Sequence, residues 1–116
     1  MSSYPFTAME QDAIRSFGRR GFRYVHETKK AVEFEDSTGR IAYLNREHSG
    51  VAVVLGFGTE TAIAALPSVI SINLRASSNF ADLGDGLTRN NKLNHQGLQV
   101  VLRSVADIET LLETLS

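Results

Sequence analysis

The sequence predicts an α+β domain, in which an antiparallel or mixed sheet of about six strands carries N- and C-terminal helices packed mainly on one face. Segments with helical spacing of apolar residues lie near both ends of the chain. The sequence between them contains short alternating segments separated by turns. The chain has 116 residues, which is close to the commonest domain size, so residues 1–116 are expected to form a single globular domain.

The N-terminal helix is expected to begin near Ala8. Thr7 and Glu10 form a capping-box pattern, in which the two residues satisfy each other's backbone N–H groups. Apolar residues then recur with helical spacing on one face, at Met9, Ala13, Ile14 and Phe17. Gly18 and Gly21, with two arginines between them, predict the end of this helix.

Four strand-like segments follow, at residues 22–27, 31–36, 40–46 and 51–57. Their period of two predicts an antiparallel meander with one packed face and one wetter face, and it assigns Glu33 and Glu35 to the wetter face. In the first segment, one face is expected to hold Phe22, Tyr24 and His26. Gly39 and Gly50 stand in turns where a positive φ is often needed. Val51–Leu55 is apolar throughout, which indicates a central strand covered on both faces.

A short helix, two more strands and the C-terminal helix are expected in the second half of the chain. Thr59–Leu66 predicts the short helix, since its alanine-rich body is closed by Pro67. Two alternating segments predict strands with one apolar face each, first Ile70, Ile72 and Leu74, then Leu98, Val100 and Leu102. Ser104 and Asp107 form a weaker capping-box pattern. The final helix then presents an apolar stripe of Val105, Ile108, Leu111, Leu112 and Leu115.

Residues 77–97 separate the last two strands and show neither helical nor strand periodicity. Connections without structure that exceed about 12–15 residues are uncommon in small domains and are usually functional or disordered. This segment has apolar residues that favour an ordered lobe over a free linker, namely Phe80, Leu83, Leu87 and Leu93. We therefore expect a long ordered loop over residues 77–97 whose polar side chains suit recognition.

Composition excludes several classes of protein. The chain has no cysteine, which removes disulfides and thiol chemistry. It has neither an apolar run of the ~20 residues needed to span a membrane nor a signal-peptide pattern, so a soluble cytoplasmic protein is expected. The net charge is +2 over residues 1–46 and −3 over residues 47–116, which fits a charged protein partner better than nucleic acid. No cofactor is expected, because Gly56-x-Gly58 lacks the third glycine of a dinucleotide-binding loop.

Two alternative functions follow from clusters of charged residues. A small metal-dependent nuclease would place carboxylates around a divalent cation with a lysine near the attacking water, drawn from Glu27, Lys29, Glu33, Glu35 and Asp36. A nucleic-acid-binding accessory protein would use the basic region of the N-terminal helix, at Arg15, Arg19, Arg20 and Arg23. Solvated surface is the simpler interpretation of both sets. The histidines are too scattered to indicate a metal site.

The segment Arg75–Phe80 reads RASSNF and is followed by the polar lobe, after which Gly97 enters a strand before the leucine-rich final helix. In this pattern and order of elements, residues 75–116 resemble small bacterial immunity proteins of contact-dependent growth inhibition systems. The resemblance implies a cytoplasmic protein without catalytic residues that blocks a toxin domain, often a nuclease. It assigns no binding residues, because the toxin-contacting surfaces of such proteins vary.

The sequence therefore favours a non-enzymatic interaction protein that covers the active site of a toxin and excludes its substrate. Polar and charged side chains of the lobe are expected to bind this partner, namely Asp82, Asp85, Arg89, Asn91 and His95. A second acidic candidate surface consists of Glu33, Glu35 and Asp36. The nuclease and the nucleic-acid-binding protein remain open as alternatives.

Overall fold

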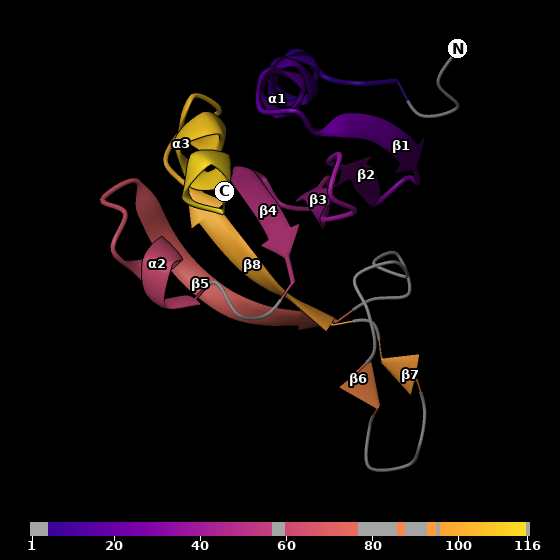
Figure 1. Cartoon of the computed structure of the whole chain (residues 1–116). Coiled ribbons are helices and arrows are strands. Elements are labelled where there is room, and N and C mark those ends of the chain that lie inside the picture. Colours follow the sequence, from indigo (N-terminus) through magenta and orange to yellow (C-terminus); the bar gives the residue numbers. More distant parts are fainter. Residues whose placement is uncertain (1–4, 57–59, 77–85, 88–92, 95, 116) are drawn as a thin grey trace.

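Six strands form one sheet in this protein (Figure 1). The computed structural model describes residues 5–56, 60–76, 86–87, 93–94 and 96–115. The helices in these ranges are α1 (Ala8–Arg19), α2 (Glu60–Ala64) and α3 (Asp107–Thr114). The strands of the sheet are β1 (Arg23–Glu27), β2 (Ala31–Glu35), β3 (Ile41–Asn45), β4 (Val51–Leu55), β5 (Val69–Ala76) and β8 (Gln96–Leu102). Their order is β1-β2-β3-β4-β8-β5 with every neighbouring pair antiparallel, so the predicted α+β class is confirmed.

The start and end of α1 follow the predicted signals. The Thr7 hydroxyl accepts a hydrogen bond from the Glu10 N–H at 3.1 Å, and the Glu10 carboxylate accepts one from the Thr7 N–H at 2.9 Å. These two bonds satisfy N–H groups that would otherwise have no partner within the helix. After the helix, Gly21 adopts a φ of 81°, a conformation that L-residues with a side chain rarely take.

The four-stranded meander also forms as predicted, and β4 is its most buried strand. Every residue of β4 is buried, and the strand lies between β3 and β8. Gly39 has a φ of 88° in the β2–β3 turn, as expected. Gly50 has no positive φ, so the prediction for this residue is wrong. Its N–H instead donates to the His48 Nδ1 atom at 3.0 Å, which closes the β3–β4 turn.

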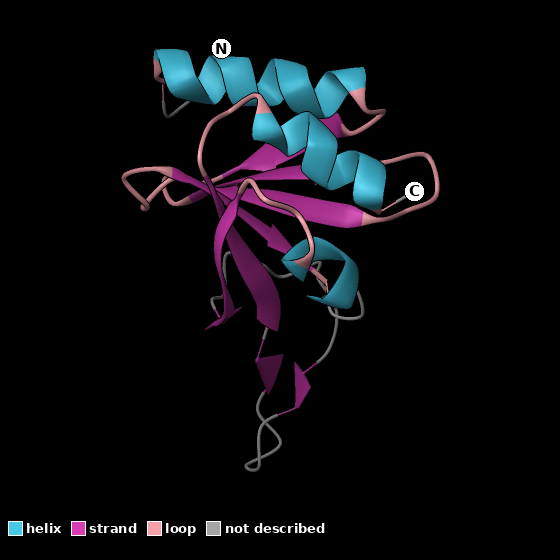
Figure 2. Cartoon of the chain, turned by 90° about the vertical axis from the view of Figure 1, so that its left-hand side faces the viewer, coloured by secondary structure: helices cyan, strands magenta, loops and turns pink. Residues whose placement is uncertain are grey.

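The main hydrophobic core lies between one face of the sheet and the helices. Figure 2 shows α1 and α3 on the same side of the sheet, and core residues come from all three helices. Phe17 of α1 stacks on Phe34 of β2 with ring centroids 3.9 Å apart. Ile63 of α2 and Leu111 of α3 are fully buried in the same cluster. The predicted packing of the terminal helices on one face is therefore confirmed.

The opposite face of the sheet is less exposed to solvent than the alternation of apolar and polar residues in the sequence predicts. Its centre holds a second, small apolar cluster of Ala31, Tyr43 and Val54. Two buried polar residues lie on the same face, where the Asn45 side-chain amide donates to the Gln99 side-chain oxygen at 2.6 Å. The pairing satisfies two polar groups that would be costly to bury alone.

Two β-bulges break the simple alternation predicted for the edge strands. In β1 the register shifts between Tyr24, which lies opposite Phe34, and His26, which lies opposite Glu33. Tyr24 and His26 therefore do not share a face, and that prediction is wrong. In β5 the register shifts between Val69 and Ser71, which leaves Ile70 58% exposed instead of packed. An extra residue in one strand moves every later side chain to the opposite face.

Part of the segment expected to lack regular structure forms a short ladder. β6 (Gly86–Leu87) pairs antiparallel with β7 (Leu93–Asn94), and β8 already begins at Gln96. The expectation of a connection without strands is therefore wrong in these positions. The other residues of the segment, including the predicted contacts Asp82, Asp85, Arg89, Asn91 and His95, lie outside the described residues. No helix in the described parts of the chain is both long and apolar enough to cross a membrane.

Candidate protein-interaction surface

Exposed apolar and charged side chains gather on β1, at one edge of the sheet. Tyr24 is 43% exposed and Val25 is 39% exposed. The other large apolar side chain with such exposure in the described ranges is Ile70, on the opposite edge strand β5. Edge strands have one side of their backbone directed away from the sheet, so they are natural contact elements. We call the exposed β1 residues Arg23, Tyr24, Val25 and His26, together with Glu35 of β2, the β1 surface.

Local contacts hold Tyr24 in place although its side chain is exposed. Its ring packs edge-on against Phe6, with centroids 6.4 Å apart. Its hydroxyl donates to a Glu27 carboxylate oxygen at 2.7 Å. Loss of hydration, followed by this hydrogen bond and the Glu27 charge, raises the pKa of Tyr24 to about 12. The side chain is thus a neutral donor at physiological pH and is ordered before any partner binds.

Glu35 of the predicted acidic surface lies next to Arg23, and Asp36 follows it in the β2–β3 turn. A Glu35 carboxylate oxygen lies 2.6 Å from Arg23 Nη2, across the β1–β2 pair. Asp36 Oδ1 accepts hydrogen bonds from the N–H groups of Thr38 and Arg40, each at 2.9 Å, and from the Thr38 hydroxyl at 2.7 Å. Loss of hydration alone would raise the pKa of Asp36, but these hydrogen bonds and the Arg40 charge outweigh it and lower the pKa below 3.8. Asp36 therefore fixes the β2–β3 turn as an anion.

The third acidic residue of that set, Glu33, does not lie on a solvated face. It is 5% exposed, and its carboxylate accepts a hydrogen bond from the buried Tyr43 hydroxyl at 3.0 Å. The expectation that Glu33 belongs to an exposed acidic surface is wrong. The alternation assigned its face correctly, but the apolar cluster around Tyr43 covers that face locally. We therefore leave Glu33 out of the β1 surface.

The four arginines of the nucleic-acid alternative all bind carboxylates. Arg15 pairs with Asp12 within α1, and Arg23 pairs with Glu35. Arg19 and Arg20 reach across to α3, where Arg19 Nε lies 2.9 Å from Glu109 and Arg20 Nη2 lies 2.5 Å from Glu113. Much of their positive charge is thus matched within the chain, which reduces the attraction for phosphate.

The carboxylates of the nuclease alternative are also engaged separately. Glu27 binds Tyr24 and lies 3.6 Å from Arg46, whereas Glu33 binds Tyr43 and Glu35 binds Arg23. In the described ranges, no group of three His, Asp or Glu side chains is arranged to hold a metal ion. Lys29 is exposed beyond the end of β1.

A buried ion cluster joins the start of α1 to the end of β3, and no local pattern in the sequence predicts it. Arg46 is 8% exposed and lies between the carboxylates of Glu10, at 2.9 Å, and Glu27, at 3.6 Å. It also donates to the carbonyl oxygens of Pro5 and Thr28, at 3.0 Å each. These partners are distant in sequence, so no spacing rule could identify them. The cluster fixes the position of Glu27, which in turn holds Tyr24 on the β1 surface.

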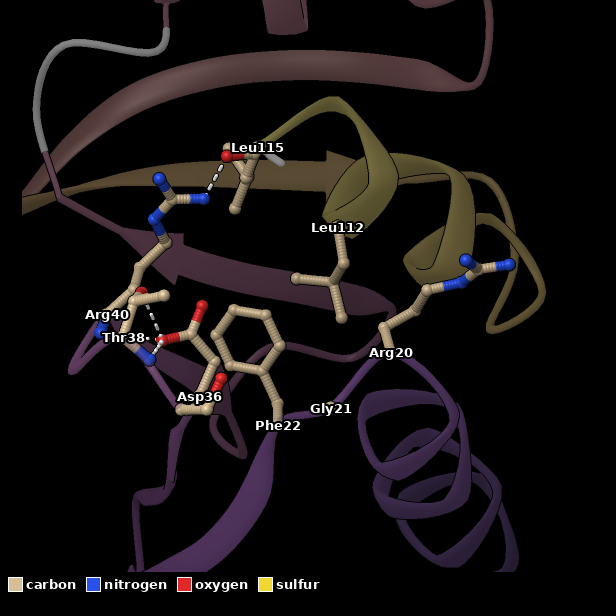
Figure 3. Close-up of a pocket in the computed structure, with 9 residues that line it drawn as sticks. Arg20, Gly21, Phe22, Asp36, Thr38, Arg40, Leu112 and Leu115 are labelled. Carbon is tan, nitrogen blue, oxygen red and sulfur yellow. Dashed lines mark hydrogen bonds between the residues drawn. The ribbon is translucent and has the colours of Figure 1, made fainter.

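A pocket of about 320 Å³ lies beside the β1 surface, between the α1–β1 turn, the β2–β3 turn and the end of α3 (Figure 3). Phe22, Leu112 and Leu115 form its apolar wall, and all three are buried. Asp36 and Arg40 line it from the β2–β3 turn. The fold thereby brings to one pocket Asp36 and Arg20, which belong to two different predicted surfaces. The sequence did not indicate this pocket, because its residues come from three separate segments.

Comparison with known proteins gives no match, whether with a protein-family model, a curated protein or a solved structure.

Proposed function

We propose that this chain is a non-enzymatic protein-binding protein that neutralises a bacterial toxin domain, as an immunity protein does. The observation that carries the proposal is the pair Tyr24 and Val25, exposed side by side on the bulged edge strand β1 with charged residues around it. Tyrosine and arginine supply much of the binding energy at protein interfaces, and charged residues at the rim select the partner.

The order of the β1 surface before binding supports a role in recognition. Tyr24 is held by Phe6 and Glu27, and Arg23 is held by Glu35. A preorganised side chain loses less conformational entropy on binding, which increases affinity. The surface also presents charges of both signs, and this suits a specific protein partner better than a uniformly charged polymer.

The resemblance of residues 75–116 to immunity proteins supports a toxin as the partner. A protein inhibitor typically buries about 800 Å² of its own surface, which is more than one short strand supplies. The predicted contacts of the lobe, including Asp82, Asp85 and Arg89, would extend the contact. The partner's active site would then be covered and its substrate excluded by steric and electrostatic effects.

We expect a neighbouring reading frame to encode a toxin domain, and binding of this chain to that purified domain tests the proposal. We expect a stable complex of the purified proteins, and Tyr24→Ala should weaken it by roughly 30-fold, the usual effect of truncating an aromatic anchor at an interface. Ile70→Ala is the matched control, because Ile70 is an exposed apolar residue on the opposite edge of the sheet. Thermal melting of both variants shows whether the fold is preserved, and Val25→Ser provides a second variant at the same surface.

Equal affinities for Tyr24→Ala, Val25→Ser and Ile70→Ala would exclude the β1 surface. Absence of a toxin gene beside this one, or absence of binding to its product, would contradict the immunity function itself.

A further inference from the structure

The pocket beside the β2–β3 turn has an apolar wall and two opposite charges. Phe22, Leu112 and Leu115 are 4%, 2% and 6% exposed, so the wall is part of the ordered core. At about 320 Å³, the volume lies at the lower end of the range for small-molecule sites. Figure 3 shows the Phe22 ring and the Leu112 side chain facing the space between Asp36 and Leu115.

One carboxylate oxygen of Asp36 is not used by the turn. The three turn hydrogen bonds all go to Oδ1, and the other oxygen accepts none from the described residues. In Figure 3 this second oxygen points up from the turn, beside the Phe22 ring. Asp36 therefore offers a fixed negative charge with remaining acceptor capacity on the wall of the pocket.

Arg40 supplies the positive charge. Its side chain runs from the turn to the end of α3, where it donates to the Leu115 carbonyl oxygen (Figure 3). It forms no ion pair within the described ranges, in contrast to Arg20 on the other wall, which lies 2.5 Å from Glu113. A guanidinium has five N–H donors, so Arg40 keeps donors for a ligand. Among the described residues that line the pocket, the charged side chains without an ion pair are Arg40 and Asp36, and their charges sum to zero.

A ligand that fits this pocket carries both charges and an apolar body. We propose that the pocket binds a free α-amino acid with an apolar side chain. Its ammonium group donates to the second Asp36 oxygen, its carboxylate accepts from Arg40, and its side chain packs on Phe22 and Leu112. A ligand with one charge leaves either Asp36 or Arg40 without a counterpart after desolvation, which reduces affinity. This site goes beyond the proposed function and does not depend on it.

Calorimetric titration of the full chain with three compounds that share a phenyl group tests the pairing of charges. We expect L-phenylalanine to bind, and we expect 3-phenylpropanoate, which lacks the ammonium group, and phenethylamine, which lacks the carboxylate, to bind about tenfold more weakly or worse. Equal affinity for all three compounds would overturn the proposal, as would failure of L-phenylalanine to bind up to its solubility limit.

Variants then locate the site. Arg40→Gln should weaken binding of L-phenylalanine by about tenfold and leave that of phenethylamine unchanged, because phenethylamine has no carboxylate. Arg103→Gln is the matched control, since Arg103 also forms no ion pair within the described ranges and lies outside the pocket. Unchanged affinity of Arg40→Gln would place the ligand elsewhere and overturn the assignment.

Arg40 also contacts α3, so a second variant separates binding from folding. Ser37 is exposed at the rim, and Ser37→Trp should block the pocket with the melting temperature unchanged. Retained binding of L-phenylalanine by a folded Ser37→Trp variant would contradict the proposal. The toxin-binding test above is independent, because L-phenylalanine is absent from it.

Discussion

Arg46 joins α1 to β1 through two ion pairs. Its guanidinium is buried between Glu10 of α1 and Glu27 of β1, with Phe6 packed over it at 5.0 Å. Removal of such a side chain leaves two carboxylates in a region of low hydration without their common counter-charge. The cost of the unpaired charges exceeds what the ion pairs contribute to stability in the intact protein.

We predict that Arg46→Ala lowers the free energy of unfolding by about 3–5 kcal/mol, as measured by urea denaturation. The matched control is Arg15→Ala, because the exposed Arg15–Asp12 pair should contribute less than about 1 kcal/mol. A loss below about 1 kcal/mol for Arg46→Ala would show that the cluster does not stabilise the fold.

The lowered pKa of Asp36 predicts how the free energy of unfolding depends on pH. Its pKa is lowered in the folded state, so the stability it contributes is present above the unfolded pKa of 3.8 and is lost as the pH falls through the folded pKa. Asp36→Asn removes this titration. We expect the variant to be less stable than the wild type at pH 6 and the difference to narrow below pH 4, as measured by urea denaturation at several pH values. If the difference in free energy of unfolding between the wild type and Asp36→Asn stays constant down to pH 2, the Asp36 carboxylate does not stabilise the turn as an anion.

Gly18 and Gly21 lie three residues apart at the end of α1 and differ in backbone conformation. Gly18 lies within α1, and a Cβ added there would meet no atom within 4 Å. Gly21 also has open space around it, but its φ of 81° strains any L-residue with a side chain. Steric space is therefore equal at the two positions, and only the backbone conformation differs.

We predict that Gly18→Ala stabilises the protein by about 0.5–1 kcal/mol, because alanine loses less backbone entropy in a helix. Gly21→Ala should destabilise it by about 1 kcal/mol or more, because the left-handed conformation is costly for alanine. Thermal or urea unfolding of the two variants measures the change in the free energy of unfolding for each. A change of the same sign in both variants would show that the α1–β1 turn is not fixed as described.

Elements whose signals are local could be predicted from the sequence. The capping pair Thr7 and Glu10 and the apolar run of β4 gave α1 and the central strand, since each signal is contained in the element itself. The bulge after Tyr24 and the bulge near Ile70 could not be predicted, because an extra residue is visible only in the register with a neighbouring strand. The exposed residues Val25 and Ile70 stand at these bulges, so the period of two in the sequence could not assign their faces.

In the candidate sites too, local patterns could be predicted from the sequence, and contacts between distant segments could not. Of the expected acidic surface, Glu35 lies on the β1 surface and Asp36 fixes the β2–β3 turn. Glu33 is buried, because the cluster around Tyr43 is assembled from several strands. For the same reason, no local pattern in the sequence predicts the Arg46 cluster or the pocket. Their residues meet only after the sheet and α3 have formed.

In the whole molecule, apolar clusters cover both faces of the sheet, and the exposed large apolar side chains of the described residues lie on its two edge strands. The helices and the main core occupy one face, and the small cluster around Tyr43 occupies the centre of the other. Both edge strands carry a bulge, and bulges disfavour the unspecific pairing of edges between molecules. Exposed apolar side chains at β1 can therefore serve a specific partner while the bulge limits aggregation.

The proposed neutralisation of a toxin through the β1 surface can be measured as survival of cells. Its most direct test is growth of cells that express the toxin domain from the neighbouring reading frame together with this chain. We expect growth with the wild type and with Ile70→Ala, and loss of growth when Tyr24→Ala and Val25→Ser are combined in a chain that still folds. Cell death with the wild-type chain would exclude neutralisation of this toxin, and full protection by the double variant would exclude the β1 surface.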